Sequence, residues 1–126
     1  MIACTAAWLP GLLWAHHSFP VFYNTSRVAE VAGTIVDVVW ANPHVRFSLR
    51  SENGEHWEVE SNSVRGMERA ELSELVIAVD GWLKVAGFPA RNGEKKMYSS
   101  NVLLPDGSEV VLRPGSERRW TEAPSE

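Results

Sequence analysis

Two short stretches of alternating apolar and polar residues flank an Asn-Gly pair in the middle of this chain. Every second residue is apolar in residues 44–50, and residues 56–60 repeat the pattern after Asn53-Gly54. Alternation of this kind is typical of half-buried β-strands, and Asn-Gly favours the tight turn of a β-hairpin. The pattern predicts an antiparallel hairpin whose inward-facing residues are Val45, Phe47, Leu49, Trp57 and Val59.

A third strand is expected before the hairpin. Residues 31–40 read as a strand with a bend or bulge at Gly33, and Ala41-Asn42-Pro43 forms a turn because Pro cannot continue a central strand. Residues 31–60 therefore predict a three-stranded antiparallel meander. Four residues of its first strand are expected to share one face: Ala32, Val36, Val38 and Trp40.

The second half of the chain predicts one helix, two further strands and a short hairpin arm. Residues 64–72 suit a short helix with Ser63 as its N-cap, strands are expected over 82–88 and 97–104, and residues 109–112 return as the hairpin arm. Three strands, a short helix and two further strands follow the order of a five-stranded, partly open Greek-key barrel of the OB type. We predict a mainly β, OB-like fold, with another small β-barrel or a β-sandwich as the alternative.

The N-terminal end is apolar and has no charged residue before Arg27. Residues 1–15 are almost all apolar, a run too short for a membrane span of about 20 residues. Its length and position fit a secretory signal with Ala15 at the cleavage site. An apolar segment that docks on the domain or a partner, or an uncleaved anchor, is the alternative. The expected organisation is a signal peptide over 1–15, an N-terminal arm over 16–30, the OB-like barrel over 31–113 and a flexible tail over 114–126.

Composition excludes several classes of protein. Hydrophobic residues make up 44% and charged residues 22% of the chain, which is too apolar for a disordered protein. The formal charge of -4 argues against nucleic acid as a partner, because affinity for phosphate depends on Lys and Arg. The single cysteine, Cys4, excludes an internal disulfide and a cysteine-based zinc site. We expect a periplasmic or secreted protein without a membrane span after processing.

The histidines are the main candidates for chemistry. His16 and His17 directly follow the expected cleavage site, so His16 would offer a free amine and an imidazole from one residue. A second imidazole, from His44 or His17, would complete three nitrogen ligands, which suit Cu(II). Cleavage before Ala15 would instead place His17 third from a free amine, in a terminal Cu(II) or Ni(II) chelate. Alternatively, the paired histidines are only polar residues of a flexible arm.

A second group of candidates lies at the first turn. Pro43 fixes the turn, and Asn42 can hydrogen-bond its own backbone. By strand parity, His44 faces solvent or a groove near Trp40. His44 is therefore the third predicted metal ligand, with Trp40 and Asn42 as a ligand surface; a structural corner with an exposed histidine is the alternative. His56 follows the hairpin turn and is expected to be a solvated strand residue.

Several segments resemble a family of small secreted bacterial proteins of unknown function. The resemblance runs from about residue 15 to about residue 112. It implies export to the periplasm and an OB-like barrel, with no activity to carry over. At Val79-Asp80-Gly81 the chain departs from the family, which usually has Gly-Asp before the fourth strand. The matching segments are Ala15-His16-His17-Ser18-Phe19, Gly33-Thr34-Ile35-Val36, Val39-Trp40-Ala41-Asn42-Pro43-His44, Val85–Ala90 and Val102–Gly107.

No familiar catalytic motif is present in the sequence. It contains no nucleophile elbow, no glycine-rich phosphate loop and no His-Glu-x-x-His pair. We therefore favour an exported, non-enzymatic binding protein that uses His16, His17 and His44, with copper as its metal. The second hypothesis is an accessory subunit that docks on a larger envelope protein through the apolar residues 8–23. An enzyme that uses bound copper is the third.

Overall fold

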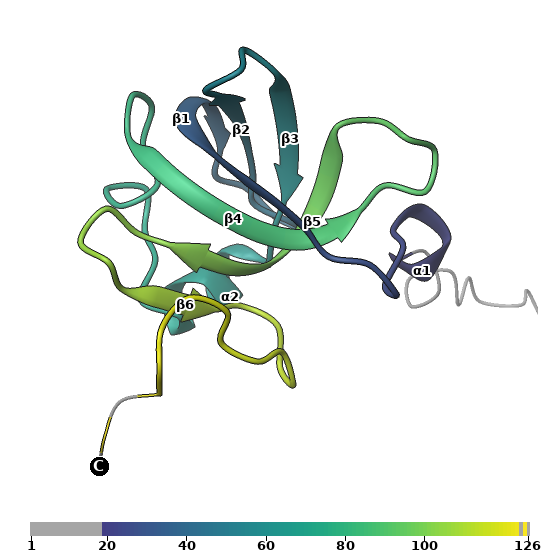
Figure 1. Ribbon diagram of the computed structural model, residues 1–126. Helices are drawn as coiled ribbons and strands as arrows, with labels where there is room; N and C mark the ends of the chain where they lie inside the picture. The colour runs from purple at the N-terminus through teal and green to yellow at the C-terminus, as the bar shows by residue number, and fades with distance from the viewer. Residues whose placement is uncertain (1–18, 124, 126) are drawn as a thin grey trace, which may run out of the picture.

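The computed structural model describes residues 19–123 and residue 125. Within these residues the chain forms two short helices and six strands (Figure 1). In chain order they are α1 (Phe19–Phe22), β1 (Ala29–Val39), β2 (Arg46–Ser51), β3 (His56–Glu60), α2 (Val64–Arg69), β4 (Trp82–Pro89), β5 (Lys96–Leu103) and β6 (Glu109–Val111).

Five of the strands close into a barrel. β1 pairs antiparallel with both β2 and β4, β2 pairs with β3, and β4 pairs with β5. The barrel closes where β3 and β5 run parallel, and β6 extends the sheet beyond β5. This strand order, with α2 between β3 and β4, confirms the predicted mainly β, OB-like barrel. The pairs that close it are Glu58 with Lys96, Val59 with Met97 and Glu60 with Tyr98.

The alternating residues of the hairpin point into the barrel as predicted. Phe47 and Leu49 of β2 and Val59 of β3 are buried, and so is Val45 just before β2. Trp57 is only half-buried and packs at the margin of the core. The hairpin therefore supplies apolar side chains to the interior and leaves its polar side chains on the outer face.

The apolar face predicted for the first strand is divided by a bulge in β1. Ile35 is fully buried, so the neighbouring Val36 faces the other way. The register with β2 shifts just after Ile35, and a bulge of this kind reverses the faces beyond it. Val38 and Trp40 therefore pack against the core, whereas Ala32 and Val36 lie on the opposite face.

Two glycines allow neighbouring strands to approach closely. A Cβ at Gly33 would collide with the carbonyl oxygen of Arg50, and a Cβ at Gly87 would collide with that of Tyr98. Both glycines lie in barrel strands, where a side chain of any size would push the neighbouring strand away. The pairing is regular at Gly33, so the bulge expected there lies instead between Ile35 and Asp37, and Gly33 serves the close approach of β1 and β2.

The second helix covers one end of the barrel and is shorter than predicted (Figure 1). The Ser63 hydroxyl accepts a hydrogen bond from the backbone N–H three residues later, which confirms the predicted N-cap. Met67 is fully buried beneath the barrel. The helix ends at Arg69 because Glu71 adopts a left-handed φ of 61° and the N–H of Leu72 turns back to the Met67 carbonyl.

Candidate functional site

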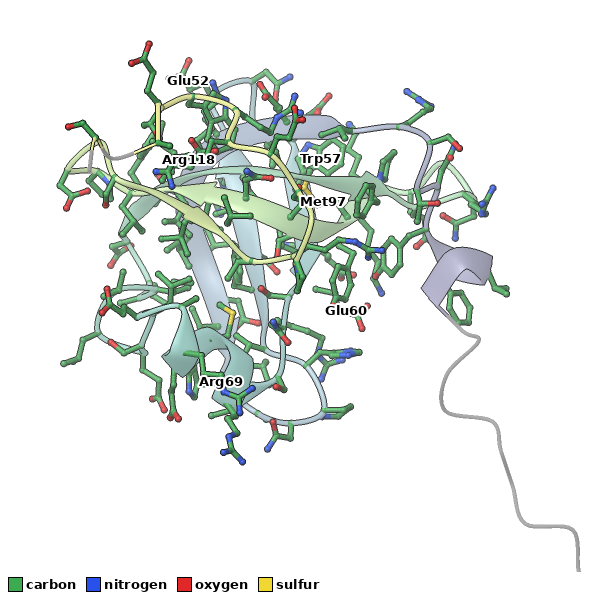
Figure 2. All side chains as sticks on the ribbon, turned by 90° about the horizontal axis from the view of Figure 1, so that it is seen from below. Glu52, Trp57, Glu60, Arg69, Met97 and Arg118 are labelled. Carbon is green, nitrogen blue, oxygen red and sulfur yellow. The ribbon has the colours of Figure 1, made fainter. Side chains whose placement is uncertain are left out.

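Four side chains meet on one side of the barrel and form what we call the Glu60 cluster: Tyr23, His44, Glu60 and Tyr98. The Tyr23 hydroxyl donates to Oε2 of Glu60 over 2.5 Å, and Nδ1 of His44 lies 2.5 Å from Oε1. The ring of Tyr98 makes edge contacts with the Tyr23 and His44 rings, with 5.7 Å between centroids in each case. Figure 2 shows Glu60 on the side of the barrel that faces α1.

The register of the hairpin brings His44 beside Glu60. Arg46 pairs directly with Glu60, and the ladder continues beyond β2 because the Val45 N–H donates to the Asn62 carbonyl over 2.9 Å. His44 is then the diagonal neighbour of Glu60 on the same face. Glu60 was not among the predicted site residues, since alternating exposed acids are common on a sheet. The Asn53-Gly54 turn was the available signal, because it fixes which residues of the two strands face each other.

Burial governs the protonation of the two tyrosines. Tyr23 is 4% exposed, and burial, a hydrogen bond to Glu60 and the charge of that carboxylate raise its pKa far above the usual range. Burial and the charge of Glu60 also raise the pKa of Tyr98. Tyr23 therefore keeps its proton at neutral pH and acts as the hydrogen-bond donor to Glu60.

The N-terminal arm docks against the end of β4 beside this cluster. Tyr23 forms an isolated antiparallel bridge with Ala90, and the Asn24 N–H donates to the Pro89 carbonyl over 2.9 Å. On the other side, the Arg91 N–H donates to the Phe22 carbonyl over 2.9 Å. Figure 1 shows α1 next to the turn between β4 and β5. The arm is thus attached to the barrel by backbone hydrogen bonds and by one buried aromatic side chain.

A pocket of about 390 Å³ opens beside the Glu60 cluster. The side chain of His44 is 41% exposed and that of Glu60 is 22% exposed, so the imidazole is held on one side but accessible on the other. The residues that line the pocket come from the arm, the first turn, β3, the segment between β4 and β5 and the start of β5: Phe22, Tyr23, His44, Glu60, Ala90, Asn92, Glu94 and Lys96.

The other predicted site residues have different surroundings. Trp40 packs against the core, and Oδ1 of Asn42 accepts a hydrogen bond from the Val64 N–H at the start of α2 over 3.0 Å. Neither is among the described residues that line the pocket. The predicted ligands His16 and His17 lie outside the described residues. Of the predicted metal ligands, the structure therefore places only His44.

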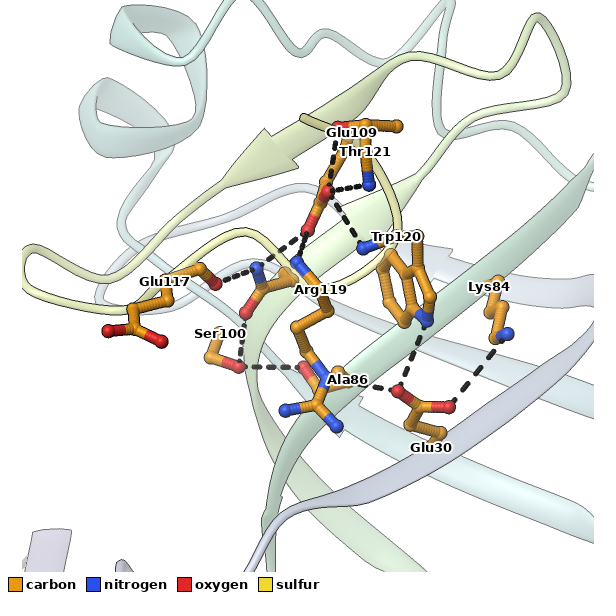
Figure 3. Close-up of polar contacts among 10 residues, drawn as sticks. Glu30, Lys84, Ala86, Ser100, Glu109, Glu117, Arg119, Trp120 and Thr121 are labelled. Carbon is orange, nitrogen blue, oxygen red and sulfur yellow. Dashed lines mark hydrogen bonds and ion pairs between the residues drawn. The ribbon is translucent and has the colours of Figure 1, made fainter. Parts of the chain in front are cut away.

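A second carboxylate cluster, the Glu109 cluster, holds the C-terminal segment. Oε1 of Glu109 accepts hydrogen bonds from the Asn101 side-chain amide and the Arg119 N–H, and Oε2 accepts from the Trp120 N–H and from the N–H and hydroxyl of Thr121 (Figure 3). These bonds are 2.7 to 3.2 Å long. Burial alone raises the pKa of Glu109, but the hydrogen bonds outweigh it and hold the pKa at about 2.

The same segment is fixed on the outer surface of β1 and β4. Glu30 accepts hydrogen bonds from Nε of Arg119 over 2.9 Å and from Nε1 of Trp120 over 3.1 Å, and it lies 3.8 Å from Nζ of Lys84 (Figure 3). The sequence predicted a flexible tail over residues 114–126, and these contacts within that range were not expected. Both carboxylate oxygens of Glu109 accept hydrogen bonds from the protein itself, which indicates a structural role.

The described part of the chain does not complete a metal site by itself. Among residues 19–123, no group of three or more His, Cys, Asp or Glu side chains is placed to hold a metal ion. No helix in the same range is both long and apolar enough to cross a membrane.

Comparison with known proteins gives the chain a family but no activity. No curated protein matches the sequence. Residues 5–99 match a family described as "Family of unknown function (DUF6152)". This match extends from the apolar N-terminal end through the first turn to the middle of β5. It covers the Glu60 cluster completely and stops before the Glu109 cluster. The chain therefore belongs to this family of unknown function.

Proposed function

We propose that the protein is an exported, periplasmic binding module of the OB type that holds Cu(II) through His44 and the paired histidines His16 and His17. The observation that carries the proposal is the 2.5 Å contact between Nδ1 of His44 and the Glu60 carboxylate. Histidines that bind metals commonly use one ring nitrogen for the metal and donate the other N–H to a carboxylate. His44 has this second contact, and its ring is exposed on the side of the pocket.

The position of the arm supports the same proposal. Tyr23 is fixed within the Glu60 cluster, and His17 is only six positions earlier in the chain. A segment of six residues spans at most about 20 Å, so the paired histidines are within reach of the pocket. Imidazole and amine nitrogens are ligands for which Cu(II) has the highest affinity among common divalent metals of the first transition series.

A Cu(II) titration of the processed protein tests this function. One equivalent should bind, and His44→Ala should weaken binding by at least about 100-fold. His56→Ala is the matched control, because His56 is an exposed histidine of β3 outside the Glu60 cluster, and it should bind as the wild type does. Binding that depends on His17 and not on His44 would indicate the terminal chelate, and an absence of saturable binding would overturn the proposal.

The proposal also requires cleavage of the leader. Mass spectrometry of the protein recovered from the periplasm should give a first residue of His16, or Ala15 for the terminal chelate. A mass that still includes Met1 would show that His16 has no free amine. The imidazoles of His16, His17 and His44 would then be the only nitrogen ligands in the proposal.

A second candidate function rests on the apolar surface of α1. Val21 is 65% exposed and Phe22 is 63% exposed, and both belong to the apolar segment over residues 8–23. An accessory subunit could use this surface to dock on an envelope protein. Val21 does not line the pocket, so Val21→Ser should weaken docking on that partner and leave Cu(II) affinity unchanged. Docking that is unchanged in this variant would contradict the second candidate.

A further inference from the structure

We infer that Glu60 and Tyr23 are positioning residues that fix the tautomer of His44 and attach the N-terminal arm to the same carboxylate. The inference deepens the proposed function, and its effect on copper affinity rests on that proposal. Its effects on the metal-free protein do not. Neither residue is proposed as a metal ligand.

The first part follows from counting protons in the Glu60 cluster. The Tyr23 hydroxyl donates to Oε2 of Glu60, and Oε1 lies 2.5 Å from Nδ1 of His44. A carboxylate can only accept, so the hydrogen bond to Oε1 requires a proton on Nδ1. A neutral imidazole has one N–H, and the lone pair must then be on Nε2. Glu60 therefore selects Nε2 as the nitrogen that a metal can use.

The packing around the ring reinforces this selection. The edge of Tyr98 contacts the His44 ring at an interplanar angle of 89°, which restricts rotation of the imidazole. A half-turn of the ring would replace Nδ1 with a carbon atom, and movement of the proton to Nε2 would leave an unprotonated Nδ1 against the carboxylate. Both changes lose the hydrogen bond to Glu60 and are unfavourable. Both the tautomer and the orientation of the ring are thus set before any ligand binds.

The second part follows from the position of Tyr23. Tyr23 is a buried aromatic residue of the arm, and its hydroxyl donates a hydrogen bond to the carboxylate that orients His44. The contact joins residues that are 37 positions apart in the chain. The hydroxyl of Tyr23 therefore links the arm and the orientation of His44 through one carboxylate.

Nuclear magnetic resonance of the metal-free protein tests the tautomer. The ring-nitrogen shifts of His44 in the wild type should be those of the Nδ1–H form, and Glu60→Gln should raise the population of the Nε2–H form. Glu58→Gln is the matched control, because Glu58 is an exposed acid two residues earlier on β3, and it should leave the shifts unchanged. A wild type with equal tautomers, or a Glu60→Gln variant that matches the wild type, would overturn the positioning role.

Hydrogen exchange tests the attachment of the arm. Tyr23→Phe retains the ring and removes the hydroxyl, so exchange of the Asn24 and Arg91 amides should accelerate by about 10-fold or more. Tyr98→Phe is the control, because it removes a phenolic hydroxyl from the same cluster and leaves the Tyr23–Glu60 hydrogen bond in place. Unchanged exchange in Tyr23→Phe would overturn this part of the inference.

Copper affinity then separates the inference from the function on which it rests. Glu60→Gln should weaken Cu(II) binding by about 10- to 100-fold, as is usual for residues that orient a ligand, and Tyr23→Phe by about 10-fold. A protein that shows the expected tautomer and exchange but binds no copper would overturn the proposed function alone. Copper binding that is insensitive to both variants would overturn the positioning role alone.

Discussion

Glu109 and Glu60 are two glutamates on strands of the same sheet, and both accept more than one hydrogen bond, but their surroundings differ. The side chain of Glu109 is 0% exposed, and its partners are backbone N–H groups, one hydroxyl and one amide of the chain itself. The side chain of Glu60 is 22% exposed, and one of its partners is an imidazole that is itself 41% exposed. The first arrangement is closed, and the second presents a nitrogen to a pocket.

The difference separates a structural carboxylate from a candidate functional one. A buried carboxylate with all its partners in the chain stabilises the fold and has nothing left for a ligand. A carboxylate that fixes one side of an accessible histidine contributes less to folding and prepares the other side of the ring for binding. Stability should therefore depend on Glu109, and ligand binding should depend on Glu60.

The largest effect on stability is expected for Glu109→Gln. The NH₂ group of a glutamine cannot accept, so at least two of the N–H and hydroxyl donors around one carboxylate oxygen would lose their acceptor. We expect the free energy of unfolding to fall by about 3 kcal/mol, measured by urea denaturation. A loss below about 1 kcal/mol would show that the closed arrangement contributes little and would remove the contrast with Glu60.

The pH dependence of stability should report the same carboxylate. The pKa of Glu109 is about 2 in the folded protein against 4.5 for a free glutamate side chain, so the folded state favours the ionised form. This contribution is complete above about pH 5 and is lost as the pH falls from 4.5 towards 2. The difference in stability between the wild type and Glu109→Gln should therefore shrink over this range. A difference that stays constant down to pH 2.5 would contradict the assignment.

A smaller loss of stability is expected for Glu60→Gln. The carboxylate is partly exposed, and water can replace part of what its two partners lose. We expect the free energy of unfolding to change by less than about 1 kcal/mol, although the same variant should weaken copper binding. A loss comparable to that of Glu109→Gln would mean that the Glu60 cluster is primarily structural.

The smallest effect is expected for Glu30→Gln on the outer surface. Glu30 contacts Lys84, Arg119 and Trp120, but its side chain is 36% exposed. Exposed pairs of this kind contribute about 0.5 kcal/mol or less, and salt screens them. Urea denaturation at low and high salt should show a small loss that disappears with added salt. If the free energy of unfolding fell by more than about 1 kcal/mol, the contacts of Glu30 on the outer surface would contribute to stability as the buried contacts of Glu109 do.

The fold was predictable because its signals are local. Strict alternation gave the correct inward faces at Phe47, Leu49 and Val59, and the Asn53-Gly54 turn gave the hairpin. The bulge just after Ile35 was missed, because one extra residue reverses the faces without leaving a distinctive pattern. The early end of α2 was also missed. Glu71 adopts the left-handed conformation that ends the helix, but glutamate is not a residue type that indicates a helix end.

The candidate site was only partly predictable. His44 could be selected because histidines are few and strand parity places it on an outer face. The roles of Glu60 and Tyr23 depend on contacts between residues 16 and 37 positions apart, and these follow from strand register and from the docking of the arm. Asn42 and Trp40 were selected as a ligand surface on polarity and aromatic character, but the fold uses one for the start of α2 and the other for the core.

The parallel pairing of β3 with β5 has a consequence for when the site exists. Glu60 pairs with Tyr98 across this seam, so two members of the Glu60 cluster meet only once strands distant in sequence have joined. Contacts of such long range carry a high entropic cost and form after local ones. The complete Glu60 cluster, with Tyr98 packed against the His44 ring, therefore exists only in a chain whose barrel has closed.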